Sequence, residues 1–144
     1  MSIKDILQEK GRHVETVRPT DTVQSAVEKL AQHNIGAMVV EDPWMHPVGI
    51  FSERDFVKAV ARHGSAALEM KVDALMSAPI ISCLPSAGVE DAMTTMTMAK
   101  IRHLPVIEDG RLQGIVSIGD LVKRRLGEKA LEADVLLDLT RMRA

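Results

Sequence analysis

Aromatic residues and cysteine are scarce in this chain of 144 residues. Phe, Trp and Tyr make up 2% of it, and tyrosine is absent altogether. Proteins that bind single-stranded nucleic acid stack its bases on several exposed aromatic side chains, so the composition argues against that function. The one cysteine, Cys83, excludes an intrachain disulfide and a zinc site made of cysteines. A chain without disulfides also fits a reducing cytoplasm.

Long apolar runs are missing as well, and no run approaches the length of a membrane span. The first residues, Met1 to Asp5, lack the apolar core of a signal peptide. We therefore expect a cytoplasmic protein that makes no membrane contact. The net charge of −2 gives no general attraction to nucleic acid. The hydrophobic share of 46% predicts an ordered globular chain.

What the sequence does contain is an internal duplication. Val17-Arg18-Pro19 aligns with Cys83-Leu84-Pro85. Farther along, residues 49–55 align with residues 114–120 once one loop residue is dropped. Two copies of one unit therefore cover residues 1–65 and 66–127, and a tail of residues 128–144 follows.

Each copy predicts the element order β-α-β-β-α. A short strand ends at a proline, apolar residues then recur at helical spacing, and two short strands and a second helix follow. One copy alone is small and leaves an open sheet face, so we expect the two copies to complete one core together. The fold class is therefore α/β (α+β). The expected strands lie at residues 13–17, 37–41 and 48–51, and at 80–83, 104–107 and 112–116; the helices begin at residues 23 and 89 and extend over 53–63 and 118–126.

Both copies contain the pattern Gly-aliphatic-x-Ser-x-x-Asp where a strand meets a helix, at residues 49–55 and 114–120. In one interpretation, the serine caps the helix and the aspartate at its third position is stabilised by the helix dipole. In the other, the glycine and the free backbone N–H groups admit a polar ligand, and the aspartate accepts hydrogen bonds from both ribose hydroxyls. If the acidic residue served only to cap the helix, glutamate would suit the third position equally well. The presence of aspartate in both copies therefore favours ligand binding.

The duplicated pattern, these two motifs and the segment Ile101-Arg102-His103-Leu104-Pro105-Val106 together resemble a pair of cystathionine-β-synthase-type (CBS) domains, the Bateman module. The resemblance covers residues 1 to about 127. It implies two repeats packed as a pseudo-twofold pair, with an adenosyl ligand bound in the cleft between them. That ligand is AMP, ADP, ATP, NAD or S-adenosylmethionine. The resemblance also implies a homodimer that forms through helices.

The resemblance further implies two related sites, in which Asp55 and Asp120 hold the ribose with Ser52 and Ser117 nearby. By position, adenine would lie against Thr16, Val17 and Ile50 in one site and against Ser82, Cys83 and Ile115 in the other. Basic residues of the opposite copy would meet the phosphates.

Those basic residues make the two sites unequal. Arg102 and His103 would face the Asp55 site, whereas Gly36 and Ala37, which carry no charge, would face the Asp120 site. Arg54 could compensate at the Asp120 site. We therefore expect the Asp55 site to bind phosphate better. The alternative for Arg102 and His103 is the exposed start of a strand.

The leading hypothesis is a non-catalytic regulatory module that senses an adenosyl ligand and needs no cofactor or metal. The sequence has no nucleophile with a base, no metal cluster and no phosphate loop, so we do not expect an enzyme. The alternative is a ligand-free dimeric module that binds an unidentified protein through Trp44 or the tail. In the tail, an apolar helix stripe is expected at Leu131, Val135, Leu136, Leu139 and Met142.

Overall fold

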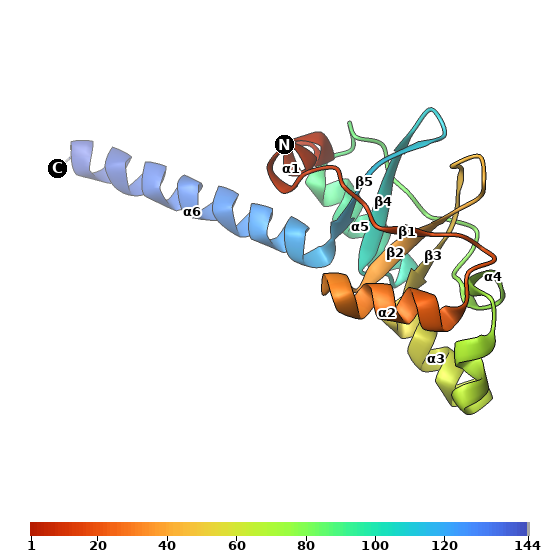
Figure 1. Ribbon diagram of the computed structural model, residues 1–144. Helices are drawn as coiled ribbons and strands as arrows, with labels where there is room; N and C mark the ends of the chain where they lie inside the picture. Colours follow the sequence, from red (N-terminus) through yellow and green to blue (C-terminus); the bar gives the residue numbers. More distant parts are fainter. Residues whose placement is uncertain (144) are drawn as a thin grey trace.

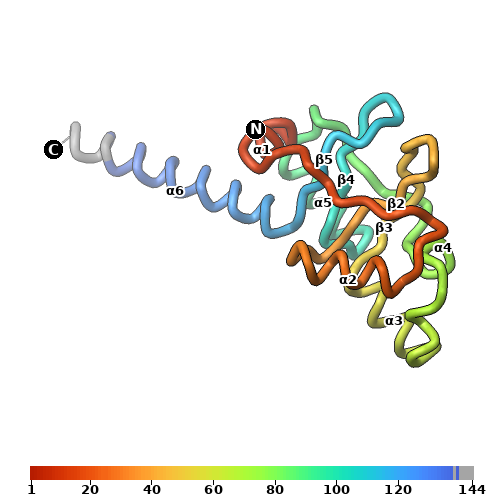
Figure 2. The backbone as a smooth tube through the Cα atoms, in the orientation of Figure 1, coloured from red at the N-terminus to blue at the C-terminus, as the bar shows by residue number. Residues whose placement is uncertain are grey.

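Two similar halves lie side by side in the computed structural model, which describes residues 1–143 apart from the side chains of residues 138 and 140–143 (Figures 1 and 2). Helices and small sheets alternate along the chain, and a long helix follows the second half. The predicted mixed α/β class and the tandem repeats are therefore confirmed.

The first repeat is built on a three-stranded sheet. β1 (Thr16–Val17) pairs in parallel with β2 (Ala37–Glu41), and β2 pairs antiparallel with β3 (Pro47–Ser52). α2 (Val23–His33) connects β1 to β2, and α3 (Glu53–His63) follows β3 directly. All five residues of β2 are buried, as expected of a central strand covered on both faces.

The second repeat has the same order with fewer paired strands. α5 (Val89–Ala99) precedes the hairpin of β4 (His103–Glu108) and β5 (Arg111–Ser117). Asp109 and Gly110 turn this hairpin with φ values of 54° and 74°, as an Asp-Gly pair favours. The strand predicted at residues 80–83 is wrong over most of its length. Of these four residues, only Cys83 pairs with β4. An apolar segment becomes a strand only where a neighbouring strand exchanges backbone hydrogen bonds with it.

The helices that lead into the two repeats are exchanged between them. α1 (Ile3–Lys10) precedes the first repeat in sequence, yet Ile3, Ile6 and Leu7 belong to the apolar core of the second. α4 (Val72–Leu75) precedes the second repeat, yet Val72 belongs to the core of the first. Each half of the molecule is therefore completed by a segment from the other half of the sequence.

The motif glycines make this exchange possible. A Cβ atom on Gly49 would lie 2.7 Å from Met76 Sδ and 2.9 Å from the Ser77 carbonyl oxygen. A Cβ atom on Gly114 would lie 2.7 Å from Leu7 Cδ2. The lead-in segments of the chain itself therefore occupy the space beside these glycines, and a Cβ atom would not fit there.

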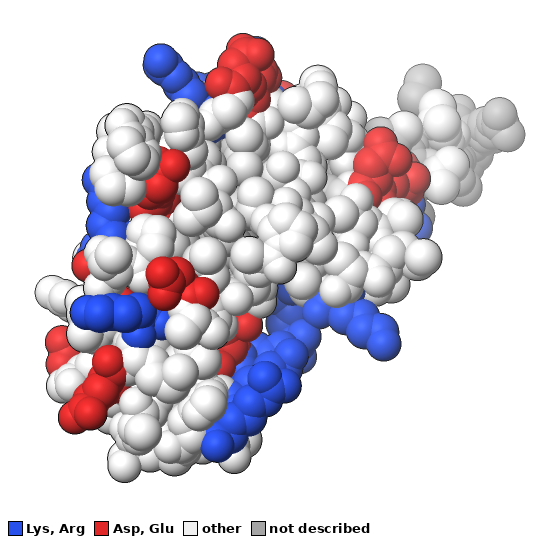
Figure 3. Space-filling view, turned by 90° about the vertical axis from the view of Figure 1, so that its right-hand side faces the viewer, with Lys and Arg blue, Asp and Glu red and all other residues white. Residues whose placement is uncertain are grey.

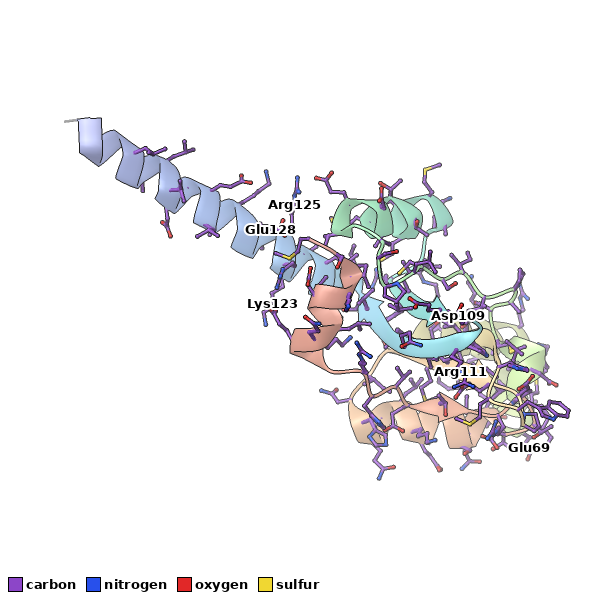
Figure 4. The ribbon with its side chains drawn as sticks, turned by 90° about the horizontal axis from the view of Figure 1, so that it is seen from above. Glu69, Asp109, Arg111, Lys123, Arg125 and Glu128 are labelled. Carbon is purple, nitrogen blue, oxygen red and sulfur yellow. The ribbon has the colours of Figure 1, made fainter. Side chains whose placement is uncertain are left out.

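α6 (Ile118–Arg143) is one continuous helix that includes Gly127 and the tail. Its first turns lie between α1 and α5 (Figure 4), where Arg124 and Arg125 form ion pairs of 2.6 Å with Glu9 and Glu90. Farther along, α6 extends away from the two halves (Figure 1), with exposed side chains at Leu131, Val135, Leu136 and Leu139. The side chain of Met142, the last residue of the predicted stripe, lies outside the described part. Among the described helices, none is both long and apolar enough to cross a membrane.

Candidate functional site

Asp55 is held at the start of α3 by a reciprocal cap. Asp55 Oδ2 accepts hydrogen bonds from the Ser52 backbone N–H at 2.9 Å and from Ser52 Oγ at 3.0 Å. Ser52 Oγ accepts in turn from the Asp55 backbone N–H at 3.3 Å. The capping interpretation of the motif is therefore confirmed. The cap directs a carboxylate that is only 9% exposed into the space between the repeats.

The segment after α4 reaches Asp55 from the second repeat. Ser77 pairs with Ile50 through two backbone hydrogen bonds of 3.0 and 2.8 Å, which place it along the free edge of β3. Ser77 Oγ then donates to Asp55 Oδ1 at 2.8 Å. The carboxylate therefore lies at a junction of the two repeats.

A cavity of about 710 Å³ opens beside this carboxylate. Residues of both repeats line it: Asp55, Ser52 and Ile50 from the first, and residues 76–81 and 99–103 from the second. A volume in this range suits a small organic ligand. The structure thus brings together the predicted Asp55, Ser52, Ile50, Arg102 and His103.

Four basic side chains contribute to the lining of the cavity. Arg54, Lys58, Lys100 and Arg102 all line it. Arg54 Nη1 donates to the Lys100 carbonyl oxygen at 2.9 Å, which ties the start of α3 to the end of α5. On one face of the molecule, Lys and Arg side chains form a diagonal band across the lower half (Figure 3). Such a cluster favours an anionic ligand.

Another part of the lining is apolar and has backbone groups without hydrogen bonds. Ile50, Met76, Ile80 and Ile81 supply its side chains. In the described part of the chain, residues 78–82 make no backbone hydrogen bond. A flat heteroaromatic ring could lie between such side chains and bind the free N–H and C=O groups along its edge.

His103 lies where the two repeats meet. Its ring would be 3.2 Å from a Cβ atom on Gly36, so the glycine leaves room for it. Burial lowers the pKa of His103, and Lys10 and Arg102 lower it further, while Glu53 and Asp120 act in the opposite direction. The imidazole is therefore neutral near pH 7 unless an anion approaches it.

Three predicted residues lie elsewhere than expected. Thr16 and Val17 do not line the Asp55 cavity, because β2 separates β1 from Ile50: Thr16 pairs with Val39, and Val39 with Ile50. Ser77 pairs with Ile50 on its other side, and residues 78–81 line the cavity instead. Arg54 lines the Asp55 cavity and not the Asp120 site, because its side chain extends from α3 toward α5.

The residues predicted around Asp120 are arranged differently. Cys83 pairs with Val106 and is separated by β4 from Ile115, and neither Cys83 nor Ser82 lines a cavity with Asp120. Burial raises the pKa of the Cys83 thiol to about 11, so the thiol stays protonated. Ser117 forms the same cap as Ser52: its N–H donates to Asp120 Oδ2 at 2.9 Å.

Sequence reasoning missed Lys58, Lys100, Ser77 and Lys10. Lys58 follows Arg54 by one helical turn, and Lys100 stands two residues before Arg102, so both could have been inferred from spacing. Ser77 and Lys10 gave no such signal. Lys10 Nζ contacts Asp120 Oδ2 at 2.6 Å across 110 residues of sequence.

Comparison with known proteins agrees with the repeat. The CBS domain model matches residues 3–62 and 72–127. A CBS-domain containing protein from Agrobacterium tumefaciens is 45% identical and superposes with a TM-score of 0.84, over 86% of this chain and 92% of that one. A mitochondrial CBS domain-containing protein of Arabidopsis thaliana, CBSX3, is 36% identical over 85% of this chain, which spans 63% of that protein's length.

Two further similar structures contain adenosyl compounds. A CBS domain protein from Pyrobaculum aerophilum complexed with AMP is 28% identical, with a TM-score of 0.75 over 83% of this chain and 89% of that one. The CBS domain pair of protein MJ0100, in complex with 5′-methylthioadenosine and S-adenosyl-L-methionine, is 26% identical, with a TM-score of 0.78 over 90% of this chain and 98% of that one. With the family model matched twice and the fold shared, the chain belongs to the CBS domain family and carries two CBS repeats.

Proposed function

We propose that the Asp55 cavity reversibly binds an adenine nucleotide and that the chain acts as a regulatory sensor of that ligand. The observation that carries this proposal is a buried acceptor carboxylate and a basic cluster on one cavity between the repeats. The relatives that bind AMP and S-adenosylmethionine support the adenosyl part of the ligand.

Asp55 holds the ribose in this proposal. Its carboxylate has two oxygens, each with room for more than one hydrogen bond, and it accepts from Ser52 and Ser77 already. A ribose diol can donate to the same two oxygens. Ser77 Oγ is a rotatable hydroxyl, so it can turn to accept from the ligand when a ribose hydroxyl takes its place at Oδ1.

The adenine ring lies against the apolar wall. Ile50, Ile80 and Ile81 contact its faces. The unpaired backbone groups of residues 78–82 bind its polar edge. In this proposal backbone groups, and not side chains, recognise the polar edge of the base. The order of backbone donors and acceptors along this segment therefore determines whether adenine binds better than other purines.

The phosphates face Arg102, Lys100, Lys58 and Arg54. This charge favours a nucleotide over S-adenosylmethionine, whose sulfonium group is itself a cation. Charge-assisted hydrogen bonds are worth about 1.5–3 kcal/mol each, so affinity should increase from adenosine to AMP and from AMP to ADP. A phosphate near His103 would also favour the protonated imidazole.

Titration calorimetry with AMP, ADP, ATP, NAD and S-adenosylmethionine tests the proposal. A nucleotide should bind, Asp55→Ala should abolish that event, and Asp120→Ala should leave it intact as the matched control. Binding should also stabilise the fold, by about 2.7 kcal/mol at a free ligand concentration of 100 times Kd. Retention of nucleotide affinity in Asp55→Ala would refute the site assignment.

The nucleotide should be bound without being converted, because the proposed contacts hold ribose, base and phosphate and none supplies a nucleophile. The same samples, analysed chromatographically after prolonged incubation, should return the nucleotide unchanged. Hydrolysis that disappears in Asp55→Ala would show an enzyme instead. The cytoplasmic location stays a prediction.

A second candidate function, assembly through α6, is favoured by the exposed apolar side chains on this helix. Leu131, Val135 and Leu139 are between 49% and 65% exposed on a segment that extends from the body. We infer a homodimer that buries them. Sedimentation velocity should show a dimer in the full chain and a monomer in Leu131→Asp/Val135→Asp. A ligand-free interaction module would keep its dimer and its protein target when Asp55 is replaced by alanine.

A further inference from the structure

Asp120 is bound by a cation of the chain itself. Lys10 Nζ donates to Asp120 Oδ2 at 2.6 Å and to the Ile115 carbonyl oxygen at 3.0 Å. Lys10 is the last residue of α1, where the negative end of the helix dipole stabilises a positive charge. Asp120 also accepts from the Ser117 backbone N–H at 2.9 Å. The ammonium group thus lies between the motif carboxylate and the strand that precedes it.

The corresponding place in the first repeat has a different occupant. There α4 ends at Leu75, and the chain continues in extended form so that Ser77 pairs with the Ile50 backbone and reaches Asp55. In the second repeat α1 continues as a helix to Lys10. The flexible Lys10 side chain there takes the place that the Ser77 backbone has in the first repeat. The carbonyl oxygens of Ile50 and Ile115 are equivalent, and they accept from Ser77 N–H and from Lys10 Nζ respectively.

We propose that Lys10 occupies the ribose position of the second repeat and competes there with adenosyl ligands, so that one chain binds such a ligand more tightly at Asp55 than at Asp120. This inference rests on the proposed function, because it assumes that the motif carboxylate is the group that holds the ribose. A ligand at Asp120 must displace the ammonium group from Asp120 Oδ2 before its hydroxyls can donate to that oxygen. Because Lys10 and Asp120 are 39% and 26% exposed, the pair is partly screened by water, and the displacement weakens binding by about two- to fivefold.

The ionisation of Asp120 agrees with this arrangement. Burial acts to raise the pKa of Asp120, but the hydrogen bonds from Lys10 and Ser117 and the charge of Lys10 outweigh it, and the net pKa is lowered. The same ammonium group helps to lower the pKa of His103.

The test uses adenosine, because the residue that corresponds to Arg102 in the first repeat is Gly36, which carries no charge. All titrations are done with Asp55→Ala, which removes the first site. Asp55→Ala should bind adenosine weakly, and Asp55→Ala/Lys10→Met should bind it about two- to fivefold more tightly, with one adenosine per chain. Asp55→Ala/Lys4→Met is the matched control, because exposed Lys4 lies on the same helix and makes no contact with Asp120. It should behave as Asp55→Ala does.

Equal affinity in Asp55→Ala with and without Lys10, including no binding in either, would overturn the proposal. A carbon-detected NMR titration of Asp120 is the second measurement. The pKa of its carboxyl group should rise when Lys10 is replaced by methionine and stay unchanged in Lys4→Met; an unchanged pKa in Lys10→Met would show that the ammonium group is not at Asp120. A different result would show that the proposed function itself is wrong: Asp55→Ala would then bind AMP as tightly as the wild-type chain does.

Discussion

The two repeats carry the same Ser-x-x-Asp cap but present its aspartate to different surroundings. Asp55 opens onto a cavity of about 710 Å³ lined with basic side chains, whereas Asp120 forms an ion pair with Lys10. The caps are alike, since each serine N–H donates to its aspartate at 2.9 Å. From this difference we infer that the Ser-x-x-Asp motif only orients a carboxylate. The segment that leads into the other repeat decides what this carboxylate can bind.

Substitution of the two motif glycines should have the largest effect and should separate the repeats. In Gly49→Ala the new Cβ meets the Ser77 backbone oxygen at 2.9 Å, and backbone paired to β3 cannot easily move. In Gly114→Ala it meets only the end of the Leu7 side chain. We expect a loss of unfolding free energy of about 3 kcal/mol for Gly49→Ala and about 1 kcal/mol for Gly114→Ala, measured by urea denaturation. Equal losses would contradict the described difference in packing.

Removal of a phosphate-binding side chain should come next in size. Arg102→Met should weaken AMP binding by about 1.5–3 kcal/mol, or roughly 10- to 150-fold, because a charge-assisted hydrogen bond is lost. Adenosine affinity should change little. The control is Lys123→Met, which removes an exposed charge far from the Asp55 cavity. If adenosine and AMP weaken equally, Arg102 shapes the cavity and does not bind phosphate.

Loss of the Lys10 ion pair should cost little stability even though it changes which ligands bind. Partly exposed ion pairs contribute about 0.2–1 kcal/mol, so Lys10→Met should lower the unfolding free energy by no more than about 1 kcal/mol at neutral pH. Thermal and urea unfolding measure this against Lys4→Met. A loss well above that value would mean that Lys10 is chiefly a structural residue.

The smallest expected effect is the pH dependence contributed by His103. Its pKa in the folded chain lies below the ordinary value of 6.5, so the unfolded chain takes up a proton first as the pH falls. Stability should therefore decrease as the pH drops below about 6.5 toward the folded pKa. His103→Gln should flatten this part of the urea-unfolding profile. A profile unchanged by the substitution would show that other histidines carry the dependence.

Much of the fold could be predicted because the repeat displays its pattern twice. The helix beginning at residue 23, the hairpin at Asp109 and Gly110 and the cap at Ser52 all follow from local spacing and turn chemistry. The site was predicted in part. Asp55, Arg102 and His103 line one cavity as expected, but Thr16 and Val17 were placed on the wrong side of β2 because strand order is not a local property.

By itself, the sequence determined the duplicated elements and the two aspartates at helix starts, since capping and hydrophobic periodicity depend on residues within one or two turns of each other. Tertiary structure alone decided which segment lies beside each aspartate. The exchange of α1 and α4 brings Ser77 to Asp55 and Lys10 to Asp120 over separations of 22 and 110 residues. Contacts at such distances depend on the packing of whole elements, and two nearly identical motifs therefore acquire different chemistry.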